Sequence, residues 1–130
     1  MGQVSRYGED MPGPVGSVMT AAFEIEGQSF IALNGGPVFK FNEAVSLQVM
    51  CTTQDEIDYY WEKLGAGGDP KARQCGWLKD KFGLSWQVVP TMLPNLVKDH
   101  ASENAKRAMA AMMEMKKLDI AELERAYAGK

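Results

Sequence analysis

The sequence predicts an α+β domain that is built on antiparallel sheet and ends in helices. Three observations lead to this class: a hairpin pattern before residue 34, an alternating strand pattern at 44–51 that runs directly into a helical pattern at 54–64, and helical spacing of apolar residues after residue 91. Because most strands precede the run of helices, the two kinds of element are segregated along the chain, as in α+β folds. A chain of 130 residues has the size of one domain.

The N-terminal part contains the hairpin pattern. A short strand is expected in "GQVSRYG" (2–8), whereas "EDMPGPVG" (9–16) has too much proline and glycine for regular structure. Two apolar runs then flank a tight turn at 26–28, and the second run stops at "NGGP" (34–37). Residues 18–33 are therefore expected to form two antiparallel strands.

A strand and a helix are expected next to each other in the middle of the chain. In "AVSLQVMC" (44–51) the residues alternate, so that Ser46 and Gln48 share the face opposite to the more apolar one. The helix that follows begins with a capping box formed by Thr53 and Glu56. Its apolar stripe consists of Ile57, Tyr60, Trp61 and Leu64.

The strand expected at 84–90, "LSWQVVP", repeats this polar pattern. Ser85 and Gln87 share one of its faces, at the same spacing as Ser46 and Gln48. Polar side chains on a strand face can bind a ligand, satisfy one another across the sheet, or face water. The residues by themselves leave these alternatives open.

Two further features complete this region. A short strand is expected near 76–79, and the glycine at the end of 81–83 indicates a turn into the next strand. Trp86 has the parity of the apolar face of that strand, so it is expected to pack under the helix at 54–64.

Three helices are expected after the last strand. Thr91 can cap a short helix that has Pro94 in its first turn, Ser102 can cap the next, and Asp119 with Glu122 opens the last. Several methionines lie here: Met109, Met112, Met113 and Met115. Methionines can form an adaptable binding surface, but helix packing against the sheet or a second subunit is the favoured interpretation.

The composition narrows the class of protein. A net charge of −3 and a pI near 5.2 are not typical of nucleic-acid binding, and no apolar run approaches the ~20 residues of a membrane span. No signal peptide is visible at the N-terminus. Two cysteines, Cys51 and Cys75, are therefore expected to be reduced thiols in a cytoplasm.

Several blocks of the chain closely resemble a known family. They are "FIALNGGPVFKFNEAVSLQV", "QDEIDYYWEKL", "CGWLKDKFGLSWQVVP" and "MKKLDIAELERAY". These blocks resemble the PhnB-like proteins, of which many carry the label 3-demethylubiquinone-9 3-methyltransferase, and the resemblance implies a bacterial protein. The family belongs to the vicinal oxygen chelate superfamily, with the glyoxalase/bleomycin-resistance/dioxygenase fold.

The resemblance implies two βαβββ modules whose sheets curl around a shared cavity. In this chain residues 3–43 would form a partial first module, 44–90 the second module and 91–130 C-terminal helices, all in one domain. The first module would lack its leading strand and helix, as in a truncated chain. Because an open sheet edge can pair with another chain, a homodimer is expected, with intertwined sheets as one arrangement.

The resemblance also bears on metal binding. Metal-using members place a histidine on the first strand and a glutamate on the last strand of the second module. Ala44 and Gln87 stand at these positions here; alanine has no donor atom, and a glutamine oxygen is a weaker ligand than a carboxylate. His100, the single histidine, lies between two tail helices. No metal and no cofactor are therefore expected.

The methyltransferase label has no counterpart in a sequence motif. S-adenosylmethionine enzymes usually have a glycine-rich turn between a strand and a helix, whereas Gly35 and Gly36 lie between two strands.

The expected function is binding of a small organic molecule in a cavity lined by Ser46, Gln48, Ser85 and Gln87. The alternatives are an enzyme, either the methyltransferase of the label or a metal-dependent lyase or dioxygenase, and a truncated chain without an active site. Whether the protein is an enzyme stays open at this point.

Overall fold

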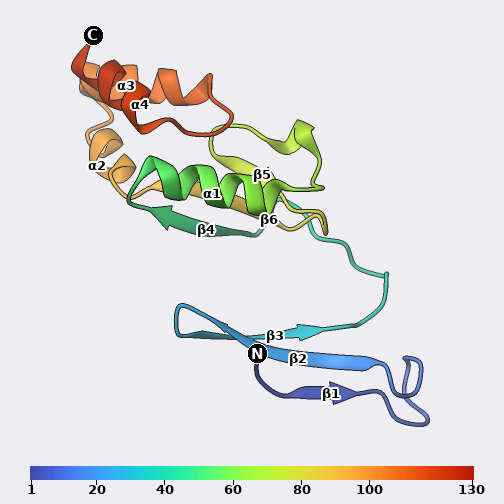
Figure 1. Cartoon of the computed structure of the whole chain (residues 1–130). Helices are drawn as coiled ribbons and strands as arrows, with labels where there is room; N and C mark the ends of the chain where they lie inside the picture. Colours follow the sequence, from blue (N-terminus) through green and yellow to red (C-terminus); the bar gives the residue numbers. More distant parts are fainter. The chain divides into compact units, whose positions relative to one another are not determined.

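The computed structural model describes residues 1–130, and the chain divides into two compact units, Met1–Lys40 and Phe41–Lys130 (Figure 1). Each unit holds one three-stranded sheet, and all four α-helices belong to the second unit. The α+β class is therefore confirmed. None of the helices is both long and apolar enough to cross a membrane.

The first unit is an antiparallel sheet in the order β1-β2-β3. Its strands are β1 (Val4–Arg6), β2 (Val18–Ile25) and β3 (Gln28–Leu33). The turn between β2 and β3 has positive φ at both central residues, 50° at Glu26 and 79° at Gly27. Two left-handed residues match the twist of a two-residue hairpin, which explains why glycine stands at the second position. The predicted hairpin is confirmed.

The second unit has a mixed sheet in the order β4-β6-β5. Its strands are β4 (Ser46–Cys51), β5 (Trp77–Lys79) and β6 (Ser85–Pro90). β5 pairs antiparallel with β6, but β4 and β6 run parallel, so the expectation of antiparallel sheet is wrong for this pair. Between β4 and β6 the chain passes through the helix α1 (Gln54–Gly65) and then through β5. Because β5 runs antiparallel to β6 and ends beside Ser85, it returns the chain to the end of the sheet at which β4 begins.

Residues 44–90 contain one strand fewer than the predicted βαβββ order. After α1 the chain forms a short 3-10 turn at Pro70–Ala72, capped by the side chain of Asp69, and only then enters β5. Pro70 has no N–H to donate to a neighbouring strand, and the glycines between α1 and this turn favour irregular backbone.

The core of the second unit lies between α1 and its sheet. Ile57 and Trp61 of α1 pack with the buried Cys51, Leu78 and Val88 of the strands. Trp86, Val49, Leu64 and Ile120 pack against this cluster, which confirms the position predicted for Trp86. Tyr60, which was predicted to belong to the apolar stripe of this helix, is 38% exposed, so the buried face of α1 is narrower than predicted.

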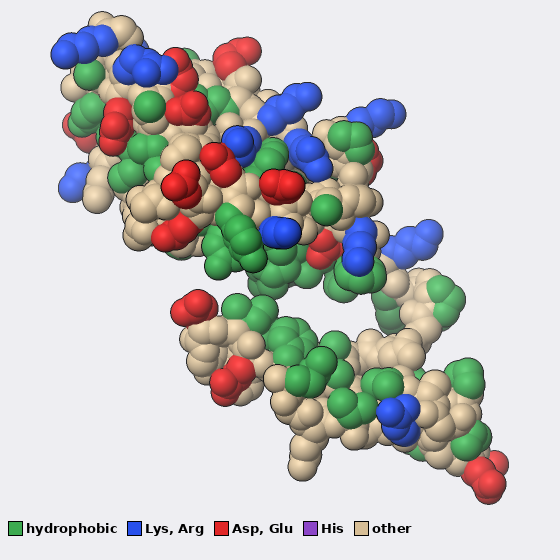
Figure 2. All heavy atoms as spheres, viewed as in Figure 1, with side chains coloured by type: hydrophobic (Ala, Val, Ile, Leu, Met, Phe, Trp, Pro, Cys, Tyr) green, Lys and Arg blue, Asp and Glu red, His purple; other side chains and the backbone are tan.

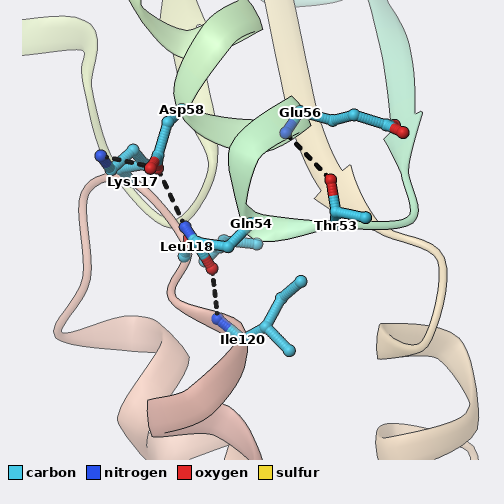
Figure 3. A network of polar contacts seen from close by, with 7 residues as sticks. All are labelled: Thr53, Gln54, Glu56, Asp58, Lys117, Leu118 and Ile120. Carbon is cyan, nitrogen blue, oxygen red and sulfur yellow. Dashed lines mark hydrogen bonds and ion pairs between the residues drawn. The ribbon is translucent and has the colours of Figure 1, made fainter.

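The beginning of α1 is capped nearly as predicted. The Thr53 side chain accepts a hydrogen bond from the Glu56 N–H at 3.1 Å (Figure 3). The Glu56 carboxylate accepts from the N–H of Thr52 at 3.2 Å, one residue before the position that the capping box requires. Both groups therefore stabilise the helix start, with the return bond shifted by one residue.

The C-terminal region forms α2 (Leu93–Val97), α3 (Glu103–Met113) and α4 (Ile120–Ala128). Ser102 and Asp119 cap α3 and α4 as predicted. The expected cap at Thr91 is wrong, because Met92 is the capping position of α2 and makes no side-chain cap. The N–H of Thr91 instead donates to the Cys51 carbonyl at 2.8 Å and so continues the pairing of β6 with β4.

The connection between α3 and α4 is tied to α1 by the side-chain amide of Gln54 (Figure 3). Its Nε2 donates to Asp58 Oδ1 at 3.0 Å and to the Leu118 carbonyl at 3.1 Å, and its Oε1 accepts from the Ile120 N–H at 2.8 Å. From the other side, the N–H groups of Cys75 and Gly76 donate to the carbonyls of Met115 and Lys116, each at 2.8 Å. The connection is therefore held at both edges.

Asp58 makes this network sensitive to acid. The Lys117 ammonium lies 2.8 Å from its carboxylate, and this hydrogen bond, followed by that from Gln54, lowers the pKa of Asp58 from its usual 3.8. Because the folded pKa is the lower one, the stabilisation is complete above the unfolded pKa and is lost as the pH falls through the folded pKa. We expect Asp58→Asn to lose stability less steeply than the wild type as the pH falls below about 4, in urea unfolding at each pH. Equal slopes would contradict this role.

Candidate functional site

The repeated serine and glutamine residues are direct neighbours in the structure. In the parallel pair of β4 and β6, Ser46 lies opposite Ser85 and Gln48 lies opposite Gln87. The alternate residues of both strands pack toward α1, so these four side chains stand on the other face of the sheet. The two similar segments therefore form a single polar ladder across two strands.

Hydrogen bonds connect three members of this ladder. Gln87 Nε2 donates to Ser46 Oγ at 2.9 Å, and Gln48 Nε2 donates to Gln87 Oε1 at 3.3 Å. The residues thus partly satisfy one another, which is one of the alternatives that the sequence left open. Each glutamine amide still has one N–H and at least one oxygen lone pair without a protein partner.

A cavity of about 770 Å³ lies against this face of the sheet, and we call it the glutamine cavity. Its sheet side is formed by Gln48, Met50, Trp77, Gln87 and Val89. Two of the four predicted site residues, Gln48 and Gln87, therefore line the cavity, whereas Ser46 and Ser85 are not among its lining residues.

The opposite wall of the glutamine cavity comes from the C-terminal region. Leu93 and Val97 of α2, Met112 and Met113 of α3, and the buried Leu118 contribute apolar side chains. From the sequence, these methionines were expected to be packing residues, and their place in the cavity wall was not predicted. Their clustering was the available signal, because methionine is common on adaptable binding surfaces.

Ser85 differs from the other residues of the ladder. It is 1% exposed, and its Oγ has no hydrogen-bond partner. A buried hydroxyl without a partner costs about 1–3 kcal/mol. This cost identifies Ser85 as a weak point of the sheet.

We expect Ser85→Ala to leave the free energy of unfolding unchanged or to raise it by up to about 1 kcal/mol, because it removes an unpaired polar group. Urea unfolding measures the change. Ser46→Ala is the matched control and should cost about 1 kcal/mol, since Ser46 Oγ accepts from Gln87. A clear loss of stability in Ser85→Ala would show that its hydroxyl has a partner.

The two cysteines have different surroundings, and both are free thiols. Cys51 is fully buried in the core, where desolvation raises the pKa of its thiol. Cys75 lines the glutamine cavity, with its Sγ 3.8 Å from Met113 Sδ. It occupies a tight turn with Gly76, at φ values of 52° and 85°. Backbone hydrogen bonds from this turn to the α3–α4 connection hold the cavity wall in position.

One charged residue lines the glutamine cavity. Glu43 forms an ion pair with Lys79, and the hydrogen bond from Lys79 is the first cause that lowers the pKa of the Glu43 carboxyl. The carboxylate is therefore ionised at neutral pH and already paired. The remaining polar lining groups, Gln48, Gln74 and Gln87, are neutral amides.

The residues do not fit a metal centre of the kind found in metal-using superfamily members. Ala44 offers no donor atom, and the Gln87 oxygen is a neutral donor that already accepts a hydrogen bond from Gln48. No three His, Cys, Asp or Glu side chains gather within either unit to hold a metal ion. His100 is exposed between α2 and α3, as expected, and does not line the glutamine cavity.

The residues also do not fit the usual strand–turn–helix site for S-adenosylmethionine. The connection from β4 to α1 consists of Thr52 and Thr53, without glycine. The helix start is capped by Thr53, and the Glu56 carboxylate lies beside it, where it would repel a ligand carboxylate. Gly35 and Gly36 follow β3 and precede no helix until after β4.

Comparisons with known proteins place these features in context. The model of the family described as 3-demethylubiquinone-9 3-methyltransferase matches residues 1–89, which include Gln48 and Gln87. A solved structure from Bacillus cereus, a PhnB protein described provisionally as a 3-demethylubiquinone-9 3-methyltransferase, is 37% identical. The alignment covers 68% of this chain and 77% of that chain, with a TM-score of 0.57. A comparison with curated proteins finds no match.

Proposed function

The chain belongs to the PhnB-like, 3-demethylubiquinone-9 3-methyltransferase family, and we propose that it binds a small organic molecule in the glutamine cavity. The observation that carries this proposal is the hydrogen-bonded pair of Gln48 and Gln87 on one side of a cavity whose other side is apolar. Small-molecule sites combine these two features, apolar walls and a few polar groups that converge.

Size supports the proposal. Ligand cavities commonly measure about 300–1,000 Å³, and the glutamine cavity measures about 770 Å³. The neutral amides and the paired Glu43 also support a site without metal and without cofactor, because none of them is a strong cation ligand in this arrangement.

The direct test is a titration with N-phenyl-1-naphthylamine, an uncharged probe whose fluorescence rises in apolar surroundings. We expect saturable binding to the wild type. Ala72 lines the cavity, so Ala72→Phe should fill part of it and weaken binding at least about tenfold. Ala121→Phe, on the exposed side of α4, is the matched control and should bind as the wild type does. Equal affinity in the two variants would place the probe outside the cavity.

The family's description makes methyl transfer the second candidate function. It is tested by incubating the protein with S-adenosylmethionine and a short-chain 3-demethylubiquinone, followed by mass spectrometry of the quinone. A product in which a methyl group has replaced a hydrogen, heavier by one CH2, formed by the wild type and not by Ala72→Phe, would replace binding by catalysis as the function. Without such a product, the binding proposal stands.

We also propose that a second copy of the chain covers the sheet of the first unit. This unit has no helix to form a second layer, and Figure 2 shows apolar side chains spread over its strands. Ile31 and Leu33 share one face and are 72% and 67% exposed, and the β3 edge has no partner strand within the unit. Uncovered apolar faces and open edges are the features that symmetric dimers bury.

Native mass spectrometry tests this dimer. We expect the wild type to be dimeric at micromolar concentration, and Ile31→Lys to shift it to the monomer of 14.3 kDa. Val15 is similarly exposed but lies in the loop before β2, so Val15→Lys is the matched control and should stay dimeric. A monomeric wild type would contradict the dimer.

A further inference from the structure

We propose that the glutamine cavity selects an uncharged, flat molecule that presents a hydrogen-bond donor next to an acceptor, as an aromatic carboxamide or a lactam does. This inference rests on the proposed function and names the chemical class of the ligand. It follows from three properties of the lining: the hydrogen-bonding groups of its amides that have no protein partner, its charge, and the shape of its apolar walls.

The hydrogen-bonding groups without a protein partner belong to the side-chain amides of Gln48 and Gln87. Gln48 uses one N–H toward Gln87 Oε1, which leaves its second N–H and its Oε1 for a ligand. Gln87 uses one N–H toward Ser46 and one lone pair toward Gln48, and keeps one of each. Exchanging the nitrogen and oxygen positions of both amides together keeps the hydrogen bond between them and still leaves a donor and an acceptor on each. Adjacent donors and acceptors are best satisfied by a ligand that carries both.

A third amide, that of Gln74, also lines the cavity. Gln74 Nε2 donates to the Met113 carbonyl at 3.0 Å, which fixes the amide and leaves its Oε1 as an acceptor. The Gln74 oxygen is therefore a further acceptor for a donor on the ligand. Burying a polar group of the site without a partner costs about 1–3 kcal/mol, so a ligand that has only acceptors would bind less tightly.

The charge of the lining disfavours ionised ligands. An anion would meet the Glu43 carboxylate, and no lysine or arginine side chain lines the cavity to compensate it. A cation would compete with Lys79, which already pairs with Glu43. Moving an ion out of water without a free counter-charge is costly, whereas an uncharged ligand avoids this cost.

The apolar walls favour a flat ring. Trp77 presents a large planar surface from β5, and Met112 and Met113 face the cavity from α3. Aromatic rings stack or pack edge-on with tryptophan, and methionine side chains adapt to them and make favourable sulfur contacts. These side chains can enclose a ring while the amides hold its polar group.

The test is a series of four matched probes that displace N-phenyl-1-naphthylamine at pH 7. They are 2-naphthamide, 2-naphthoate, 2-naphthylmethylammonium and 2-acetonaphthone. We expect 2-naphthamide to bind at least about tenfold more tightly than either ion, and several-fold more tightly than 2-acetonaphthone, which has an acceptor but no donor. Gln48→Leu should reduce the preference for the amide over the ketone. Gln28→Leu, in the first unit, should retain it.

The outcomes separate this inference from the proposed function. Binding of 2-naphthoate or 2-naphthylmethylammonium as tight as that of 2-naphthamide would overturn the ligand class and leave the cavity as a binding site. An unchanged preference in Gln48→Leu would overturn the part assigned to the amide ladder. Failure of every probe, N-phenyl-1-naphthylamine included, would overturn the proposed function as well.

Discussion

Replacing Gly76 by alanine is expected to lower the free energy of unfolding by about 3 kcal/mol. Gly76 has a φ of 85°, and a Cβ atom there would lie 3.0 Å from Leu118 Cδ1 and 3.1 Å from the Val88 carbonyl oxygen. Leu118 is fully buried, and the Val88 carbonyl is part of the central strand β6, so neither can move easily. The alanine therefore adds a steric conflict to an unfavourable backbone conformation.

Gly83→Ala is the matched control for this prediction. Gly83 has a φ of 89°, but nothing lies within 4 Å of a Cβ atom built there. Gly83→Ala should therefore lower the free energy of unfolding only by the strain of an alanine in the left-handed conformation, about 1–2 kcal/mol. Urea unfolding of both variants gives the two values. If they were equal, Leu118 would not be packed against the turn at Gly76, and the described position of the cavity wall would be incorrect.

Replacing Gln54 by leucine is expected to cost about 3 kcal/mol, the second large effect. The substitution removes three hydrogen bonds and leaves the Leu118 carbonyl and the Ile120 N–H without their partners in a half-buried place. Urea unfolding measures the loss, and hydrogen exchange of the Ile120 amide should become faster. Because Leu118 lines the glutamine cavity, binding of N-phenyl-1-naphthylamine should weaken as well.

Gln54→Glu separates the hydrogen bonds of Gln54 from its packing. The glutamate has nearly the same shape and can still accept from the Ile120 N–H, but as a carboxylate it cannot donate to Leu118 and faces Asp58. Protonation of the glutamate restores one donor. The difference in free energy of unfolding between Gln54→Glu and the wild type should therefore shrink as the pH falls. A deficit that does not depend on pH, or a loss below about 1 kcal/mol in Gln54→Leu, would contradict the role of this amide.

The two large effects concern the same piece of structure. Gly76 and Gln54 hold the connection between α3 and α4 from opposite edges, and this connection carries Leu118 into the cavity wall. The residues that match the family model end at 89, whereas the wall continues through α2 and α3. The shape of the glutamine cavity therefore depends on the attachment of the C-terminal region to the rest of the second unit.

Local features of this protein could be predicted from the sequence, because neighbouring residues decide them. The turn at Glu26 and Gly27 needs two left-handed residues, and the caps at Ser102 and Asp119 bond to N–H groups three residues ahead. The family could also be recognised, since its blocks are continuous stretches of chain. Alternation along β6 likewise placed Trp86 under α1 correctly.

Pairing between distant segments was decided only by the tertiary structure. Alternation shows that Ser85 and Gln87 share a face, but it does not say which strand lies beside them or in which direction that strand runs. The parallel register with Ser46 and Gln48 follows from the path of the chain through α1 and β5, and the same pairing continues to Thr91, whose N–H donates to the Cys51 carbonyl, so that α2 begins one residue later than predicted. Helical periodicity likewise predicts that Met112 and Met113 belong to an apolar helix face, but it does not predict that this face lines a cavity. The reason is physical: local patterns record conformational preference and burial, whereas a cavity is the space left between elements that meet only when the chain is folded.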